Sequence, residues 1–211
     1  MLSYADLLKR IIGKQVKLTG LTGCFAHIAR YEHRDDLLSA AGSRFSPGRY
    51  HLEGGAPALY FAESPVTALV EIEQLLGSEG AMILNRRPPM ILVNVDITIP
   101  PRNVLDLTTG EEVLETLGTS LQELTGSWLL EDDPPTQRLG QAAYDSEKVV
   151  AIRYPSGKWR GATLQRNVVV FRDRLVRFSQ RGALLAPFDP NAVLPVTIRS
   201  IPYRRLSFRR P

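Results

Sequence analysis

Apolar residues recur along the chain in patterns that predict short helices and strands. In residues 4–12 the leucines and isoleucines follow helical spacing, which predicts a short amphipathic helix. Residues 24–29 and 58–62 are compact apolar runs, and each predicts a core strand. Ser64 can cap a helix that begins at Pro65, and Gly77 is expected to end it. The apolar face of that helix would comprise Val66, Leu69, Val70, Ile72, Leu75 and Leu76.

The strongest strand signal is the β-branched run 90–97, which prolines flank on both sides. Beyond it the pattern predicts a short edge strand at 104–107, a helix at 110–124, a proline-containing acidic loop at 128–137, a helix at 139–144, a strand at 149–154 that ends in a turn at 155–157, and a strand at 167–171. Helices and strands mix without regular βαβ alternation, which indicates the α+β class.

Composition indicates one soluble domain spanning residues 1–211, because 44% hydrophobic and 23% charged residues over this length are ordinary for a single core. Within it, residues 1–20 would form an N-terminal helix and lead-in, and 196–211 a basic tail. No apolar run approaches the roughly 20 residues that span a bilayer, so we expect no membrane partner. The first residues lack a signal-peptide pattern, and the single Cys24 fits a reducing cytoplasm.

The net charge of +4 resides largely in the tail arginines. A nucleic-acid surface would need a basic stripe interleaved with exposed aromatics, and Tyr203 and Phe208 offer only a faint version of one. We therefore expect no direct nucleic-acid binding. The tail is interpreted as a solvated segment or as a surface for an acidic partner protein.

Candidate chemistry gathers in residues 42–71. A glycine-flanked Arg49 can hold a phosphate, Tyr60 can stack on a flat heterocycle, and Glu71 can polarise a ribose hydroxyl. Three histidines and one cysteine do not fall into metal-ligand spacing, so no metal is expected. Together these residues predict a site for a dinucleotide whose glycosidic bond is broken.

Residues 21–160 resemble the RES-domain family of bacterial toxins. The likeness rests on the Gly-Arg turn at 48–49, the Pro-Ala-Leu-Tyr strand that ends at Tyr60, and the following helix with Glu71. It implies an ADP-ribosyltransferase-like fold, in which two split β-sheets with flanking helices hold NAD in a cleft. It also implies that NAD is consumed as a substrate.

The resemblance assigns Glu71 as the catalytic carboxylate, which would stabilise oxocarbenium character on the ribose. A helix-surface acid is the structural alternative. Tyr60 is implied as the stacking platform for nicotinamide, where a core tyrosine is the alternative. Arg49 is implied as a phosphate ligand, where an ordinary salt bridge is the alternative. Tyr50 and His51 occupy the family's usual aromatic and Asn positions, and His51 is a candidate ribose contact.

The first strand departs from the family, most of whose members carry a phosphate-binding arginine there. Either Ala26 or His27 takes its place. With His27 in the cleft, the set His27, Tyr60 and Glu71 resembles the His-Tyr-Glu arrangement of diphtheria-type ADP-ribosyltransferases; a core histidine is the alternative. Arg30 or Arg34 can supply the missing positive charge from the neighbouring loop.

Ser156 matches the serine in the family name and is a candidate ligand of nicotinamide or phosphate, although a Pro-Ser-Gly turn needs no such role.

The leading interpretation is the toxin of a toxin–antitoxin pair, which transfers ADP-ribose from NAD to a protein. Some family members modify an enzyme of nucleotide synthesis. NAD phosphorolysis or hydrolysis is the second hypothesis, and a non-catalytic binding module is the third. The resemblance also implies an antitoxin that occludes the cleft, in a homodimer or a toxin–antitoxin heterotetramer.

Overall fold

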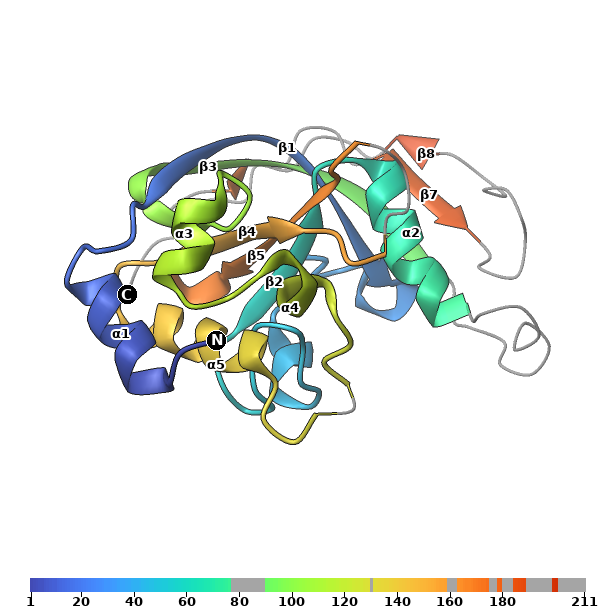
Figure 1. Cartoon of the computed structure of the whole chain (residues 1–211). Coiled ribbons are helices and arrows are strands. Elements are labelled where there is room, and N and C mark those ends of the chain that lie inside the picture. The colour runs from blue at the N-terminus through green and yellow to red at the C-terminus, as the bar shows by residue number, and fades with distance from the viewer. Residues whose placement is uncertain are drawn as a thin grey trace.

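The described strands of this computed structural model form one hydrogen-bonded sheet, with helices packed around it (Figure 1). The structure describes residues 1–76, 90–129, 131–158 and 163–174, and the backbone of 178–179, 184–188 and 199–200. The helices are α1 (Tyr4–Ile12), α2 (Pro65–Leu76), α3 (Glu111–Thr116), α4 (Leu121–Thr125) and α5 (Pro135–Asp145), with short 3-10 turns at Tyr31–His33, Ala41–Arg44 and Arg172–Arg174. The strands are β1 (Thr19–Arg30), β2 (Ala58–Ala62), β3 (Met90–Asp106), β4 (Ala151–Pro155), β5 (Arg166–Phe171), β6 (Phe178–Ser179), β7 (Leu184–Phe188) and β8 (Arg199–Ser200).

The sheet closes on itself, because the order β1-β2-β5-β4-β3 is completed by a further pairing between β1 and β3. Most neighbours are antiparallel, whereas β3 and β4 run parallel. The seam between β1 and β2 is narrow and has a single register pair, Ala26 with Ala62. Strands β6 and β7 extend the sheet from β3, and β8 pairs with β7.

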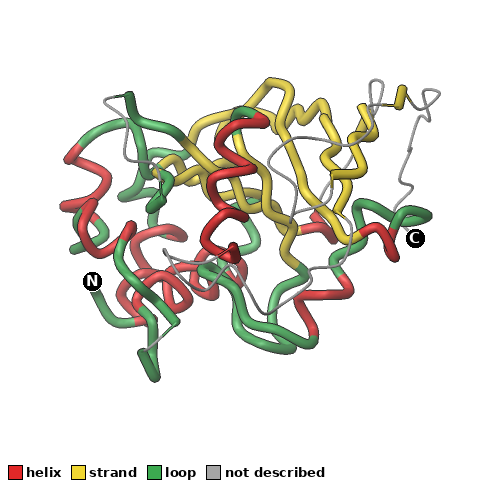
Figure 2. The backbone as a smooth tube through the Cα atoms, turned by 90° about the vertical axis from the view of Figure 1, so that its right-hand side faces the viewer, coloured by secondary structure: helices red, strands yellow, loops and turns green. Residues whose placement is uncertain are grey.

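Two large apolar clusters stabilise this arrangement. One lies among the strands and takes alternate side chains from all five members of the ring, such as Phe25, Phe61, Val95 and Val168. The other lies between the sheet and helices α1, α3, α4 and α5, where Leu7, Leu124 and Leu139 are fully buried. Helices α1 and α5 lie side by side beneath the sheet, while α2 lies away from them and packs against β1 and β2 (Figures 1 and 2).

The strand expected at 90–97 and the edge strand expected at 104–107 are one continuous strand, β3. Prolines 100 and 101 were expected to separate them. The structure accommodates both in a bulge, where Thr19 pairs with Val104 but Leu21 pairs with Ile99. Arg102 has a positive φ of 73° at this point, which lets the chain return to the same ladder. Proline is tolerated there because a bulge leaves residues outside the regular hydrogen bonding.

Two further boundary predictions are corrected. The helix expected at 110–124 is two short helices, because Gly118 takes a φ of 59° and breaks the chain direction between α3 and α4. The acidic loop expected at 128–137 ends earlier, because α5 begins at Pro135 rather than at 139. Proline is well suited to a first helical position, where its missing N–H would have had no partner.

The other predicted strands are present with shifted bounds: β1 begins at Thr19, well before the expected residue 24, while the bounds of β4 and β5 shift only slightly. Helix α1 and strand β2 have the predicted bounds, and α2 is capped as expected, since Ser64 Oγ accepts a hydrogen bond from the Thr67 N–H at 3.0 Å. The expected end of α2 at Gly77 and most of the 196–211 tail lie outside the described residues. The α+β class is confirmed, while the finer assignment of split sheets in an ADP-ribosyltransferase-like fold stays a prediction. Within the described ranges, no helix is long and apolar enough to cross a membrane.

Candidate active site

A pocket of about 400 Å³ opens at the narrow seam between β1 and β2. Strands β1, β2, β4 and β5, helix α2 and the loop after α4 contribute to its wall. Its lining comprises Ala26, Ile28, Gly48, Arg49, Tyr60, Phe61, Ala62, Ala68, Glu71, Trp128, Leu129, Tyr154, Lys158 and Asn167. This volume is within the range typical of small-molecule sites. Three of the residues predicted from sequence therefore meet there: Glu71, Tyr60 and Arg49.

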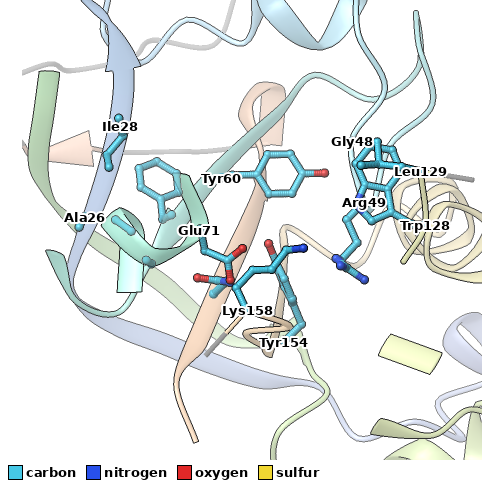
Figure 3. A pocket seen from close by; sticks show the side chains of 14 residues that line it. Ala26, Ile28, Gly48, Arg49, Tyr60, Glu71, Trp128, Leu129, Tyr154 and Lys158 are labelled. Atoms are coloured by element: carbon cyan, nitrogen blue, oxygen red, sulfur yellow. The ribbon is translucent and has the colours of Figure 1, made fainter. Parts of the chain in front are cut away.

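Small side chains position Glu71. Ala68 of α2 packs against Ala26 and Ala62 at the seam, so the helix lies close to both strands. Glu71 is three residues further along α2 and therefore lies on the same face as Ala68. Its carboxylate accepts two short hydrogen bonds on Oε1, from Ser156 Oγ at 2.6 Å and from Asn167 Nδ2 at 2.6 Å. Figure 3 shows this carboxylate directed into the pocket beside Tyr60 and Lys158.

Tyr60 lines the pocket with its ring, while its hydroxyl is tied to the neighbouring turn. The hydroxyl accepts a hydrogen bond from the Tyr50 N–H at 3.0 Å and lies 2.9 Å from His51 Nδ1. His51 Nε2 lies 3.0 Å from the Ser46 carbonyl, so Nε2 carries the proton and Nδ1 accepts from Tyr60. Burial lowers the pKa of His51, which favours this neutral ring. Burial also raises the pKa of Tyr60 well above its ordinary value, so its hydroxyl stays protonated.

Arg49 lies on the opposite side of the pocket from Glu71 (Figure 3). Its Nη1 donates to the carbonyls of Leu124 and Gly126, at 2.7 and 3.0 Å, which fixes the guanidinium against the end of α4. The turn before it is equally constrained. Gln137 of α5 donates to the Gly48 carbonyl at 3.0 Å. A Cβ at Gly48 would lie 2.3 Å from the His51 ring, so only glycine fits there.

Ser156 was expected to contact the ligand, and the structure shows that it contacts Glu71. It is buried and follows the last residue of β4, Pro155. Its hydroxyl donates to Glu71 Oε1, and its side chain is not part of the pocket wall. The structure therefore joins Ser156 to the predicted catalytic carboxylate, as a residue that orients it.

Ala26, and not His27, faces the pocket. Successive side chains of a strand point to opposite faces, so Ala26 and Ile28 line the wall while His27 points away. The His27 ring lies 5.2 Å from the Phe61 ring, and its Nδ1 donates to the Tyr60 carbonyl at 2.7 Å. Burial lowers its pKa. The expected His-Tyr-Glu arrangement is therefore not assembled in this pocket, because the alternation of β1 turns His27 to the other face.

Three further candidates also lie outside the pocket wall. Tyr50 is fully buried in the helix-facing core, with its ring 4.6 Å from the ring of Tyr154, so only its backbone N–H serves the site. Arg30 is exposed at the end of β1 and pairs with Glu32 at 3.3 Å. His51 is likewise absent from the wall and acts on it through Tyr60.

Several lining residues were not predicted from the sequence. Asn167 and Tyr154 were included only as strand positions, and Lys158, Trp128 and Leu129 only as loop or flanking positions. Only the register of β4 and β5 would have indicated that Tyr154 and Asn167 belong to the site, because these two residues pair across the two strands. That pairing puts an aromatic ring and an amide next to each other below α2. Local sequence carries no indication of it.

The assembled pocket combines a carboxylate with oriented hydrogen-bond donors, an aromatic ring and two cationic side chains, Arg49 and Lys158. Such a set suits a ligand that contains hydroxyl groups, a flat ring and an anionic group. In the described part of the chain, no cluster of three or more His, Cys, Asp or Glu side chains is arranged to hold a metal ion.

Comparisons with known proteins identify the fold and the family of this chain. A search of curated proteins finds no match. Among solved structures, the crystal structure of the M. tuberculosis MbcT–MbcA toxin–antitoxin complex contains a similar chain, with a TM-score of 0.64 and 23% sequence identity. The match covers 85% of this chain and 91% of that one, so the two share a fold. The model of the RES domain family matches residues 24–189, which include the seam, the pocket and Glu71, and the chain therefore belongs to the RES domain family.

Proposed function

We propose that this protein is the toxin of a toxin–antitoxin pair and that it cleaves the nicotinamide–ribose bond of NAD. The observation that carries the proposal is the Glu71 carboxylate, held by Ser156 and Asn167 in the same pocket as Tyr60 and Arg49. Membership of the RES domain family supports NAD as the substrate. A carboxylate fixed by two 2.6 Å hydrogen bonds is preorganised, which is the main requirement for stabilising a developing positive charge.

In the proposed reaction, the bond between nicotinamide N1 and ribose C1′ breaks, and its electron pair neutralises the pyridinium ring. Nicotinamide leaves, and C1′ gains oxocarbenium character. Glu71 stabilises this charge through the ribose 2′-hydroxyl, the Tyr60 ring packs on nicotinamide, and Arg49 holds a phosphate oxygen. An acceptor oxygen or nitrogen then forms the new bond to C1′ and releases its proton.

Two acceptors are consistent with this pocket. Transfer of ADP-ribose to a protein would bring the acceptor to the side of the pocket where Leu129 is exposed. Phosphorolysis or hydrolysis is favoured by Arg49 and Lys158, which put positive charge where inorganic phosphate would bind. The likeness of His27, Tyr60 and Glu71 to the His-Tyr-Glu set of ADP-ribosyltransferases no longer favours transfer, because the His27 side chain lies outside the pocket wall.

We also propose an antitoxin partner that covers the pocket mouth. The similar chain belongs to a toxin–antitoxin complex, which supports a partner of this kind. The proposal places the protein in the cytoplasm, where NAD is available.

The proposal is tested by incubating the purified protein with NAD labelled on the adenylate phosphate, in host-cell lysate, beside a Glu71→Gln variant. Glutamine keeps the shape of the side chain but removes its charge, so we expect turnover to fall by about 10²-fold or more. Glu111→Gln serves as the matched control, because Glu111 is exposed at the start of α3, away from the pocket wall.

The labelled products identify the acceptor. A discrete labelled protein that disappears with Glu71→Gln supports transfer, whereas loss of NAD with only small labelled products supports phosphorolysis or hydrolysis. Undiminished turnover by Glu71→Gln would contradict the role of Glu71. No turnover by the unmodified protein would favour a non-catalytic binding module.

A further inference from the structure

Asn167 belongs to the pocket wall, and its side chain has a buried hydrogen-bond acceptor without a partner in the described structure. The residue is 3% exposed and lies at the second position of β5. Its Nδ2 donates to Glu71 Oε1, and a carboxylate can only accept, so the orientation of the amide is determined. Oδ1 is then the remaining polar atom, and it has no hydrogen-bond partner among the described residues. An unpaired buried acceptor is costly, which indicates that a bound molecule supplies the donor.

Glu71 provides a second acceptor beside it. Both hydrogen bonds that the structure records for this carboxylate fall on Oε1, from Ser156 and from Asn167. Oε2 is thus the oxygen left for a ligand. Because Asn167 Nδ2 and Glu71 Oε1 are 2.6 Å apart, the two side chains are in direct contact and present neighbouring acceptors on one wall of the pocket.

Two neighbouring acceptors match two neighbouring donors. Adjacent hydroxyl groups on one sugar ring present such a pair, and each hydroxyl can donate to one acceptor. A carboxamide also has two N–H groups, but both are on one nitrogen, in a group attached to the flat nicotinamide ring. The Tyr60 ring is the suitable surface for that flat ring.

We propose that Glu71 and Asn167 together bind the vicinal diol of the nicotinamide ribose, with Asn167 Oδ1 accepting the hydrogen bond of the 3′-hydroxyl. This inference rests on the proposed NAD cleavage and adds a substrate-contacting residue to it. Asn167 thus has two tasks: its Nδ2 orients Glu71, and its Oδ1 selects a ribose with an intact diol.

The test compares NAD with the analogue that lacks the 3′-hydroxyl of the nicotinamide ribose, by kcat/KM, in three proteins. The kcat/KM of the unmodified protein is expected to be about tenfold higher for NAD than for the analogue, because one buried neutral hydrogen bond contributes about that factor. In Asn167→Ala the preference is expected to fall to about twofold or less, because the partner of that hydroxyl is gone. Any intrinsic difference in reactivity between the two substrates cancels in this comparison.

Ser156→Ala is the matched control. It removes the other hydrogen bond to Glu71 Oε1, so turnover should fall for both substrates while the preference for NAD is retained. Equal kcat/KM for both substrates in the unmodified protein would overturn the proposal even if Asn167→Ala failed to fold. A preference that survives in a folded Asn167→Ala would also overturn it, leaving NAD cleavage intact. Absence of NAD turnover in the unmodified protein would remove both proposals.

Discussion

At the scale of single residues, Tyr60 has two parts with separate tasks. Its ring lines the pocket, while its hydroxyl joins the Tyr50 N–H to His51 Nδ1 and thereby holds the turn that carries Arg49. The ring alone is sufficient for stacking on a heterocycle, which needs only the aromatic face. The hydroxyl therefore contributes to the stability of the turn more than to binding.

Tyr60→Phe is expected to lower the free energy of unfolding by about 1–3 kcal/mol, because it leaves two partly buried polar groups without a partner. The kcat/KM for NAD should change less than about tenfold, since the ring remains. Urea denaturation and a nicotinamide-release assay measure the two quantities.

The matched control is Tyr4→Phe, whose hydroxyl donates to Asp145 at the surface. We expect it to change stability by less than about 0.5 kcal/mol. A Tyr60→Phe variant as stable as the unmodified protein would show that the turn does not depend on this hydroxyl.

Residues with a distinctive local context were the ones that could be predicted. Glu71 lies on the helix that follows the Pro-Ala-Leu-Tyr strand, as in the family motif, and Arg49 follows a glycine, so both were identified from the sequence. Asn167 was not identified, because nothing near it in the sequence shows that its amide contacts Glu71. That contact arises only when α2 brings Glu71, together with Ser156 from the end of β4, to this strand position. The sequence left open whether Ala26 or His27 faces the cleft, since neighbouring strand residues differ only in the face that register assigns them.

At the scale of elements, α5 supports the turn that carries Arg49 by close backbone contact. Gly140 faces the backbone of Tyr50, and a Cβ at this position would lie 2.0 Å from the Tyr50 carbonyl oxygen. Gln137, one turn earlier, donates to the Gly48 carbonyl. Helix α5 therefore determines where the turn with Arg49 lies.

Gly140→Ala is expected to destabilise the protein by about 3 kcal/mol or more, because the clash is with backbone that has no alternative rotamer. Thermal unfolding followed by circular dichroism measures the loss. Gly42→Ala is the control, since a Cβ at Gly42 meets nothing within 4 Å. Equal melting temperatures for the two variants would contradict the close approach of α5 to the turn.

The predicted boundaries of elements were wrong where tertiary contacts outweighed the local sequence signals. The prolines at 100 and 101 are strong strand breakers, yet β3 continues past them, because β1 pairs on both sides of the bulge. Gly118 was overlooked inside a predicted helix, although its positive φ separates α3 from α4. By contrast, α1 and β2 were predicted with correct bounds, because each has a complete local pattern.

At the scale of the whole molecule, two histidines connect folding to pH. His27 of β1 donates to the Tyr60 carbonyl of β2, and His51 contacts the Tyr60 hydroxyl; burial lowers the pKa of both histidines. In the unfolded chain they would bind protons below about pH 6.5. The unfolded state thus holds more protons than the folded state in acid, and stability rises with pH across that range.

The free energy of unfolding is therefore expected to fall as pH decreases from about 7 towards 5. The double variant His27→Gln, His51→Gln should show a smaller decrease over the same range, measured by urea denaturation at several pH values. His33→Gln provides the control, because His33 is exposed. An equal decrease in the double variant would exclude these two groups as the cause.

The sequence by itself determined the α+β class, the capped helix α2 and the strand β2, because these depend on local spacing and capping. It also placed Glu71, Tyr60 and Arg49 in one site, mainly because the motifs that carry them resemble those of the RES domain family. Only the tertiary structure decided that β1 turns Ala26 and not His27 to the pocket, that Ser156 and Asn167 hold Glu71, and that His51 acts through Tyr60. The physical reason is register: a shift of one residue moves every side chain of a strand to the other face, and the pairing of distant strands sets it.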